Sequence, residues 1–417
     1  MKNKINITLL FSLALFACMV TSCEENYTGK YEITDGTPVI HYVRVPDAAK
    51  ADSLLVGANL GETICLVGDN LTSIRELYFN DQKALLNINF ITKHTLIVTV
   101  PRNLPEDRTD KMYMVLKNGN KVDYDFLVLY PAAEIYRFEC EHVPAGGKVV
   151  LHGDFFFNEP GDPINISVGD YSVPYSDIYV DELTQTKVAF KAPPENITGS
   201  ARIKTFYGTS KRSKAIFRDT RGMLINFDDV PFVAGWGRPG AAQIQNDPQL
   251  SLSGNYLRWE GAVDGSNWNG KYDDGWCLNY WGEQNGFPAG NIFPSAPETS
   301  ILKFEANVVQ PWSGFPLSIL FYAQGDNEGK IWDDGYPRGL WRPWYVDGSV
   351  VPYTSDGWVT VSIPLKDFNL NTRGEPSNLD FPTAFGGFTF VAKGGGHVGV
   401  PCNPVILFDN IRVIPGD

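Results

Sequence analysis

The chain has 417 residues, a length that suits about three domains of ordinary size. Charged residues make up 20% and hydrophobic residues 43%, which excludes a disordered chain and a membrane-embedded bundle. The 48 acidic residues outnumber the 35 lysines and arginines, which argues against nucleic acid as a partner, because binding phosphate groups requires a basic face. Its 40 glycines and 28 prolines favour short strands and turns over long helices.

The N-terminus has the features of a targeting segment. Lys2 and Lys4 precede an apolar run, 7–20, that is too short to span a bilayer. The run ends in Val20-Thr21-Ser22-Cys23, which resembles a bacterial lipobox. We therefore predict a lipoprotein signal peptide at 1–22 and lipidation of Cys23, with an ordinary signal peptide as the alternative.

Two acidic residues follow the predicted lipidation site. Glu24 and Glu25 resemble the signal that exports Bacteroidetes lipoproteins to the outer face of the outer membrane. We expect a lipid-anchored, cell-surface protein whose residues 23–35 form a tether, because acyl chains hold a protein on a membrane without a transmembrane helix.

The first half of the chain contains an internal repeat. Residues 61–69 read GETICLVGD and residues 146–154 read GGKVVLHGD, and each copy is followed by further apolar strands that end at proline. Alternating strands bounded by Gly and Pro predict antiparallel β-sandwiches at 36–130 and 131–218. The opening Pro38-Val-Ile-His-Tyr-Val43 and the G-x-x-I-x-L-x-G pattern resemble the IPT/TIG immunoglobulin-like domain, which implies a spacer or a protein-contact module.

The cysteines and histidines of the chain give no sign of a metal site. Past the signal peptide, the cysteines are far apart and lack the spacing of a zinc site, so we expect buried free thiols at Cys65, Cys140, Cys277 and Cys402. The isolated histidines are expected to be surface or strand residues: His94, His142 and His152.

The region 219–417 differs in composition from the rest of the chain, because all ten tryptophans lie between Trp236 and Trp358. Residues 302–308 and 359–365 alternate apolar and polar side chains, and Phe-Asp strands at 224–229 and 405–413 bracket the region. We predict a β-jelly roll similar to carbohydrate-binding-module sandwiches. The whole chain is thus expected to be all-β.

Many of the aromatic residues lie beside Gly, Pro, Asn or Asp, which predicts exposed loops. Flat aromatic rings match the apolar face of a sugar, and polar side chains match its hydroxyl groups. The predicted glycan-binding residues are Trp236, Tyr280, Trp281, Trp332, Trp341 and Trp344. Trp259 and Trp358 are expected in the core, and Trp268 and Trp276 are left open.

The order of lipobox, acidic residues, IPT/TIG-like domains and tryptophan-rich sandwich resembles a Bacteroidetes surface glycan-binding protein of the SGBP-B type. The resemblance implies non-catalytic binding of a plant polysaccharide, a β-glucan such as xyloglucan or mixed-linkage glucan. It also implies a partnership with an outer-membrane uptake transporter complex of the Sus type. The family's aromatic platform is carried over to Trp236, Tyr280 and Trp281, so that 219–417 alone should bind glycan.

Two other classes of function stay open at this point. A glycoside hydrolase would need two facing carboxylates, for which Asp273-Asp274 and Asp333-Asp334 are the candidates, although Asp-Asp-Gly is typical of turns. A protein-binding adhesin would use the same IPT/TIG domains. No cofactor or metal is predicted, although Asp228 and Asp409 leave structural calcium possible in principle.

Overall fold

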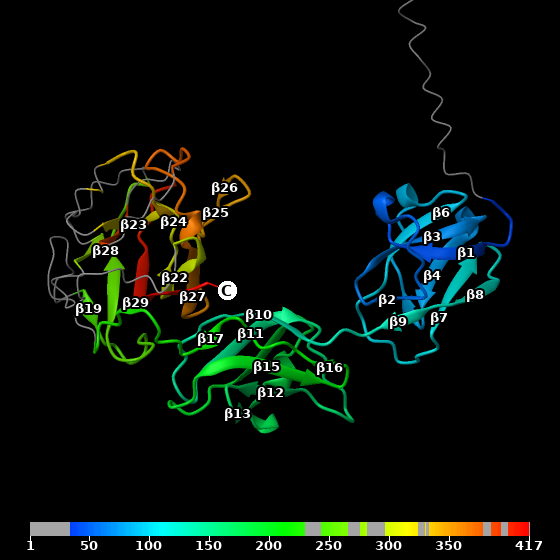
Figure 1. Ribbon diagram of the computed structural model, residues 1–417, viewed down its shortest axis with the longest axis horizontal. Helices are drawn as coiled ribbons and strands as arrows, with labels where there is room; N and C mark the ends of the chain where they lie inside the picture. Colours follow the sequence, from blue (N-terminus) through cyan, green and yellow to red (C-terminus); the bar gives the residue numbers. More distant parts are fainter. Residues whose placement is uncertain are drawn as a thin grey trace, which may run out of the picture. The chain divides into compact units, whose positions relative to one another are not determined.

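The computed structural model describes residues 34–229, 243–265, 276–281, 297–323, 330, 333–377, 385–392 and 399–416. The described part is built from strands and short 3-10 turns, which confirms the all-β prediction (Figure 1). The chain divides into two compact units, Met1–Pro131 and Ala132–Asp417. No helix in the described residues is long and apolar enough to cross a bilayer.

The first unit is a β-sandwich. One sheet has the order β1-β3-β6, the other has the order β5-β4-β7-β8, and β2 and β9 form a parallel pair. Its core lies between the sheets, with Ile64 and Leu66 of β3 and Leu77 and Phe79 of β4 all buried. The strands are β1 (Val39–Arg44), β2 (Gly57–Asn59), β3 (Thr63–Asp69), β4 (Ile74–Phe79), β5 (Gln82–Lys83), β6 (Thr95–Thr99), β7 (Lys111–Leu116), β8 (Lys121–Asp125) and β9 (Leu127–Leu129).

The second unit begins with another sandwich, which contains the second copy of the repeated sequence, residues 146–154. Its sheets have the orders β10-β11-β14 and β13-β12-β15-β16, with β17 paired to β15. Leu151 of β11 and Ile203 of β15 belong to one core cluster between the sheets. The strands are β10 (Glu134–Phe138), β11 (Lys148–Asp154), β12 (Asn165–Val168), β13 (Tyr171–Ser172), β14 (Lys187–Lys191), β15 (Gly199–Thr205), β16 (Gly208–Thr209) and β17 (Ile216–Phe217).

The repeated glycine has the same structural role in both sandwiches. Gly68 pairs with Ile40 and Gly153 pairs with Ile135, and in each pair a β-bulge follows on the partner strand. A Cβ atom at either glycine would lie 1.9 Å from a backbone oxygen of that strand. The sequence therefore requires glycine here because two backbones approach closely.

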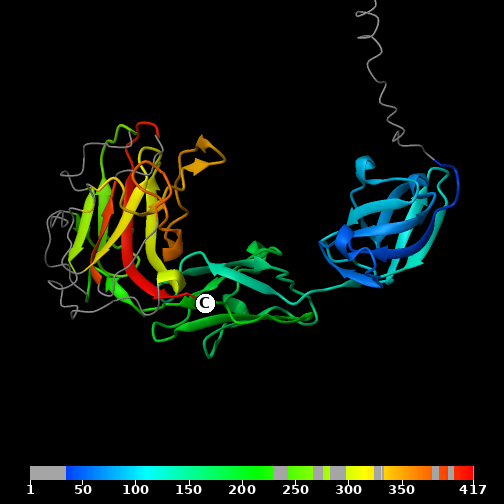
Figure 2. The same ribbon diagram turned by 45° about the horizontal axis from the view of Figure 1, so that its top comes forward.

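The rest of the second unit is a larger sandwich of two sheets that lie face to face (Figures 1 and 2). The six-stranded sheet has the order β19-β20-β29-β22-β27, with β18 beside β29, and the four-stranded sheet has the order β21-β28-β23-β24. The aromatic core between them includes Phe304 and Phe408 from one sheet and Phe388 from the other. The strands are β18 (Met223–Ile225), β19 (Ile244–Gln245), β20 (Tyr256–Glu260), β21 (Cys277–Trp281), β22 (Ser300–Gln310), β23 (Leu317–Ala323), β24 (Gly339–Trp341), β25 (Tyr345–Val346), β26 (Ser349–Val350), β27 (Val359–Pro364), β28 (Phe385–Val391) and β29 (Val405–Pro415).

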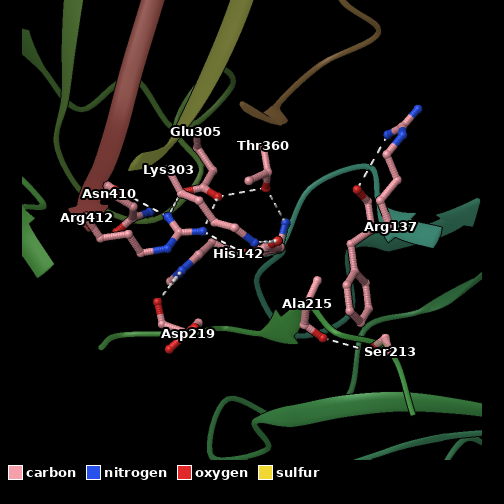
Figure 3. Close-up of polar contacts among 12 residues, drawn as sticks. Arg137, His142, Ser213, Ala215, Asp219, Lys303, Glu305, Thr360, Asn410 and Arg412 are labelled. Carbon is pink, nitrogen blue, oxygen red and sulfur yellow. Dashed lines mark hydrogen bonds and ion pairs between the residues drawn. The ribbon is translucent and has the colours of Figure 1, made fainter. Parts of the chain in front are cut away.

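A buried cluster of charges joins this C-terminal domain to the second sandwich (Figure 3). Glu141, which follows β10, accepts a hydrogen bond from Arg412 Nη2 (2.8 Å) and forms an ion pair with Lys303. Glu305 accepts from Arg412 Nη1 (2.7 Å) and from Thr360 Oγ1 (2.8 Å). The two cations and two carboxylates balance, which is the condition under which buried charges are tolerated. We call Glu141, Lys303, Glu305 and Arg412 the joint cluster.

The electrostatics of the joint cluster favour the ionised forms of Glu305 and Arg412. Burial alone would raise the pKa of Glu305, but the Arg412 guanidinium holds that pKa below its usual value. Burial alone would lower the pKa of Arg412, but the two glutamates raise it instead. His142 lies beside the cluster, and its Nε2 donates to the carbonyl oxygen of Asp219 (3.1 Å). The sequence analysis missed this role, because an isolated histidine carries no signal of a partner distant in sequence.

The predicted thiols are free in the structure. Cys65, Cys140 and Cys277 are buried and Cys402 is partly buried, which confirms the prediction for the first three and leaves Cys402 more accessible than expected. Burial raises the pKa of the Cys140 thiol well above its usual value, so it is protonated and unreactive at neutral pH.

Candidate functional site

Tyr280 is not part of an exposed platform. Its side chain has no exposed surface and stacks on Phe388 with ring centroids 5.0 Å apart and an interplanar angle of 21°. The predicted loop at 279–282 begins instead as a strand, because β21 pairs with β28 as far as Trp281 opposite Gly387. The neighbouring Gly282 suggested a turn, but the alternation of Leu278 and Tyr280 toward the core was the stronger signal.

Trp344 is also a core residue, contrary to the prediction. It is fully buried, and its Nε1 donates a hydrogen bond to the backbone oxygen of Phe315 (2.8 Å). Trp341 is half-buried, and its ring lies 5.1 Å from that of Trp312. The nearby Pro343 indicated a loop and hence exposure for these indoles, yet the hydrophobic interior of this domain is rich in aromatic side chains.

Other predicted residues have different outcomes. Trp236, Trp332, Trp268 and the Asp273-Asp274 pair lie outside the described residues, and for Trp281 only the backbone is described. Trp259 is buried, as predicted, and so is Trp276, which had been left open. Trp358 is half-buried against the core of the second sandwich.

The described part of the candidate site is the side of the four-stranded sheet that faces away from the core, which we call the outer face. Side chains alternate along a strand, so Cys277 and Asn279 of β21 lie on the opposite side from Leu278 and Tyr280. Asn279 Oδ1 accepts a hydrogen bond from Thr389 Oγ1 (2.6 Å), and both side chains are fully buried. Polar groups buried on a sheet face in this way can serve as fixed hydrogen-bonding positions.

One edge of the outer face holds a buried arginine. Arg338 has no exposed surface, and among the described residues its Nη1 has no hydrogen-bond partner. Its Nη2 donates to the backbone oxygen of Asp333 (3.4 Å). Burial lowers the pKa of Arg338 to about 10, against the opposite effect of Asp334 and Asp333. A buried donor without a partner is costly, and an acceptor such as a hydroxyl oxygen would satisfy it.

The second aspartate pair organises a turn. Asp333 Oδ1 accepts from the backbone N–H of Gly335 (3.0 Å), and Asp334 Oδ1 accepts from Thr372 Oγ1 (3.0 Å). Both aspartates are exposed. These contacts agree with the predicted turn role of the Asp-Asp-Gly sequence.

Comparison with known proteins places the chain in a family. Residues 217–415 match the family model of the surface glycan-binding protein B xyloglucan binding domain. The crystal structure of the surface glycan-binding protein PbSGBP-B from Prevotella bryantii is 33% identical, with a TM-score of 0.63 over 92% of this chain and 99% of that one. The chain belongs to the surface glycan-binding protein B family. This family consists of glycan-binding proteins and not of enzymes.

Two further proteins resemble this chain over a shorter length or at lower identity. An IPT/TIG domain-containing protein of Bacteroides ovatus is 32% identical over 160 residues, which cover 36% of this chain and about a third (31%) of that protein. SGBP-B from a complex xyloglucan utilization locus in Bacteroides uniformis is 18% identical, with a TM-score of 0.46 over 91% of this chain and all of that one.

Proposed function

We propose that the chain binds a plant-type β-glucan, such as xyloglucan or mixed-linkage glucan, through its C-terminal domain. The observation that carries this proposal is the match of residues 217–415 to a xyloglucan-binding domain. In this proposal the upstream sandwiches are spacers that hold the C-terminal domain away from the membrane.

The chemistry of the outer face supports binding of a neutral sugar chain. Asn279 and Thr389 are buried and bonded to each other, whereas Arg338 Nη1 is a donor that the described residues leave unpaired and that a sugar hydroxyl oxygen could accept from. Trp281 ends the strand that carries Asn279, so we keep it, with Trp236 and Trp332, as the proposed aromatic contacts. Sugar rings would contact these indoles while their hydroxyl groups reach the polar side chains.

The proposed place of action is the cell surface. Lipidation at Cys23, followed by Glu24 and Glu25, would anchor the chain on the outer face of the outer membrane. There it would pass captured polysaccharide to an outer-membrane uptake transporter complex. Protease treatment of intact cells should remove the protein, and its full resistance would contradict this location.

Affinity gels test the proposed ligand class. The soluble chain, residues 24–417, should be retarded by xyloglucan or mixed-linkage glucan and should release no reducing sugar on prolonged incubation. Gels containing mannan and xylan serve as the comparison for linkage specificity. Free migration in both β-glucan gels would contradict the proposal, and turnover that is lost on substitution of Asp273, Asp274, Asp333 or Asp334 would indicate a hydrolase.

A further inference from the structure

A pocket of about 630 Å³ lies beside β27, where the C-terminal domain meets the second sandwich. We call it the junction pocket. The second sandwich contributes Arg137 and Glu139, and the C-terminal domain contributes Trp341, Arg342 and Tyr353, together with β27 itself. Its volume lies within the range of about 300–1,000 Å³ that is typical of small-molecule sites.

The walls of the junction pocket are held in place by contacts outside it. The Trp341 ring packs edge-on against Phe304 with centroids 5.5 Å apart. The Tyr353 backbone N–H donates to the carbonyl oxygen of Trp312 (2.9 Å). Glu139 Oε2 lies 2.8 Å from His152 Nε2. A site with fixed walls loses little entropy when it binds a ligand.

The second sandwich is also fixed relative to the C-terminal domain at this pocket. The backbone N–H of Thr360 donates to the carbonyl oxygen of Glu139 (2.8 Å), and Glu141, two residues later, belongs to the joint cluster. Figure 3 shows Thr360 at the cluster, while the Arg137 side chain extends away from it. The two domains therefore form one continuous pocket wall.

The charges that line the junction pocket cancel. Arg137 and Arg342 provide two guanidinium groups, and Glu139 and Asp367 provide two carboxylates. Such a lining has no net charge with which to select an anion or a cation, but it has many donors and acceptors for hydroxyl groups. The partly exposed rings of Trp341 and Tyr353 add apolar contact surface.

We propose that the junction pocket is a second carbohydrate site, which binds a short segment of a neutral oligosaccharide. It lies between two edge strands, β27 of the six-stranded sheet and β24 of the four-stranded sheet, whereas β21, which carries Asn279 of the outer face, does not line it. The proposal shares with the proposed function only the class of ligand. A chain that occupies both sites would be held at two points, so polysaccharide would bind more tightly than oligosaccharide.

Hydrogen exchange measured by mass spectrometry can locate such a ligand. The ligands are cellohexaose, xylohexaose, mannohexaose and a xyloglucan heptasaccharide, each added at saturation to residues 24–417. We expect at least one to slow the exchange of amides in Val359–Pro364 and Gly339–Val346 by about threefold or more. Amides in Cys277–Trp281 report separately on the outer face.

Two variants test whether this protection arises in the junction pocket. The double variant Arg137→Ala/Arg342→Ala removes one guanidinium group from each wall. The variant Ser362→Ile instead adds a larger side chain at an exposed position of β27 that lines the pocket. Both should abolish the protection of β27. The control Arg75→Ala/Arg202→Ala removes the same charge from exposed positions elsewhere and should keep it. Thermal melting establishes that each variant is folded.

The outcomes separate the two proposals. Protection of β21 without protection of β27 by any of the ligands overturns the junction pocket and leaves the proposed function intact. Protection of β27 that persists in both pocket variants also overturns it. Protection of β27 that the variants abolish supports the pocket, even if the β-glucan gels fail to retard the chain.

Discussion

The Trp344 indole fills part of the core and satisfies its own polar atom, because its Nε1 donates to the carbonyl oxygen of Phe315. Replacing Trp344 by alanine should therefore lower the free energy of unfolding by about 3–5 kcal/mol, as for other buried large side chains. Urea denaturation of residues 132–417 measures this change. A loss under about 1 kcal/mol would place the indole at the surface and contradict the assignment.

Trp281 should behave in the opposite way if it contacts the glycan. We expect Trp281→Ala to change the free energy of unfolding by under about 1 kcal/mol and to weaken β-glucan binding by about 2 kcal/mol, some thirtyfold. Titration with β-glucan oligosaccharides and thermal melting provide the two values. Tyr136→Ala, at a 60% exposed tyrosine of the second sandwich, is the control that should alter neither. Unchanged binding would remove Trp281 from the site.

The local sequence distinguished buried from exposed aromatic side chains only where the alternation of a strand was clear. Trp259 was correctly predicted as buried because it alternates with Arg258 in a strand. Tyr280 and Trp344 were wrongly predicted as exposed, because neighbouring Gly and Pro residues indicate a turn but not which side chains leave the core. The Asn279–Thr389 pair was missed, since its members are distant in sequence and meet only through the pairing of β21 with β28.

At the scale of the strand, the absence of a side chain at Gly153 of β11 allows the backbone of β10 to approach closely beside its β-bulge. An alanine Cβ there would lie 1.9 Å from the Glu134 oxygen and 2.4 Å from the Phe156 ring. Gly153→Ala should therefore destabilise the second sandwich by about 1–3 kcal/mol, the usual effect of overpacking. Gly161→Ala is the matched control, because a Cβ at Gly161 has nothing within 4 Å. Equal melting temperatures for the two variants would show that the bulge adapts without cost.

Several of the longer strands could be predicted from hydrophobic periodicity. The repeat at 61–69 and 146–154 corresponds to β3 and β11, and the alternating residues 302–308 lie within β22. β21 was missed because Asn279 and the following glycine resemble a loop, whereas the strand is formed through pairing with β28. Strand pairing between distant segments is decided by tertiary contacts, which local propensity does not encode.

At the scale of the whole molecule, the joint cluster limits how the chain can be divided. Residues 219–417 were predicted to bind glycan alone, but this fragment lacks Glu141 and leaves Lys303 and Arg412 with one carboxylate fewer. Removing one partner of a buried ion pair costs about 3–5 kcal/mol. We expect 219–417 to unfold at lower urea concentration than 132–417, and equal midpoints would show that the cluster contributes nothing to stability.

His142, which lies beside the joint cluster, should make the stability of the fold depend on pH. Burial is the main reason that the pKa of His142 lies below its usual value of 6.5, and Arg412 acts in the same direction. Below pH 6.5 the unfolded chain takes up a proton there that the folded chain does not, so stability should fall as the pH falls. Melting of wild type and His142→Gln from pH 8 to pH 5.5 should show the smaller decrease in the variant. Parallel curves would exclude His142 as the cause.

The contact between Glu139 and Thr360 also covers part of an edge strand. β27 is the last strand of its sheet, and the second sandwich occupies part of its outer edge through the hydrogen bond from Thr360 N–H. An uncovered edge strand presents backbone donors and acceptors to the same strand of another molecule. Proteolysis between the two domains would expose the Thr360 N–H at this edge. We therefore expect the second sandwich to limit edge-to-edge pairing of this sheet.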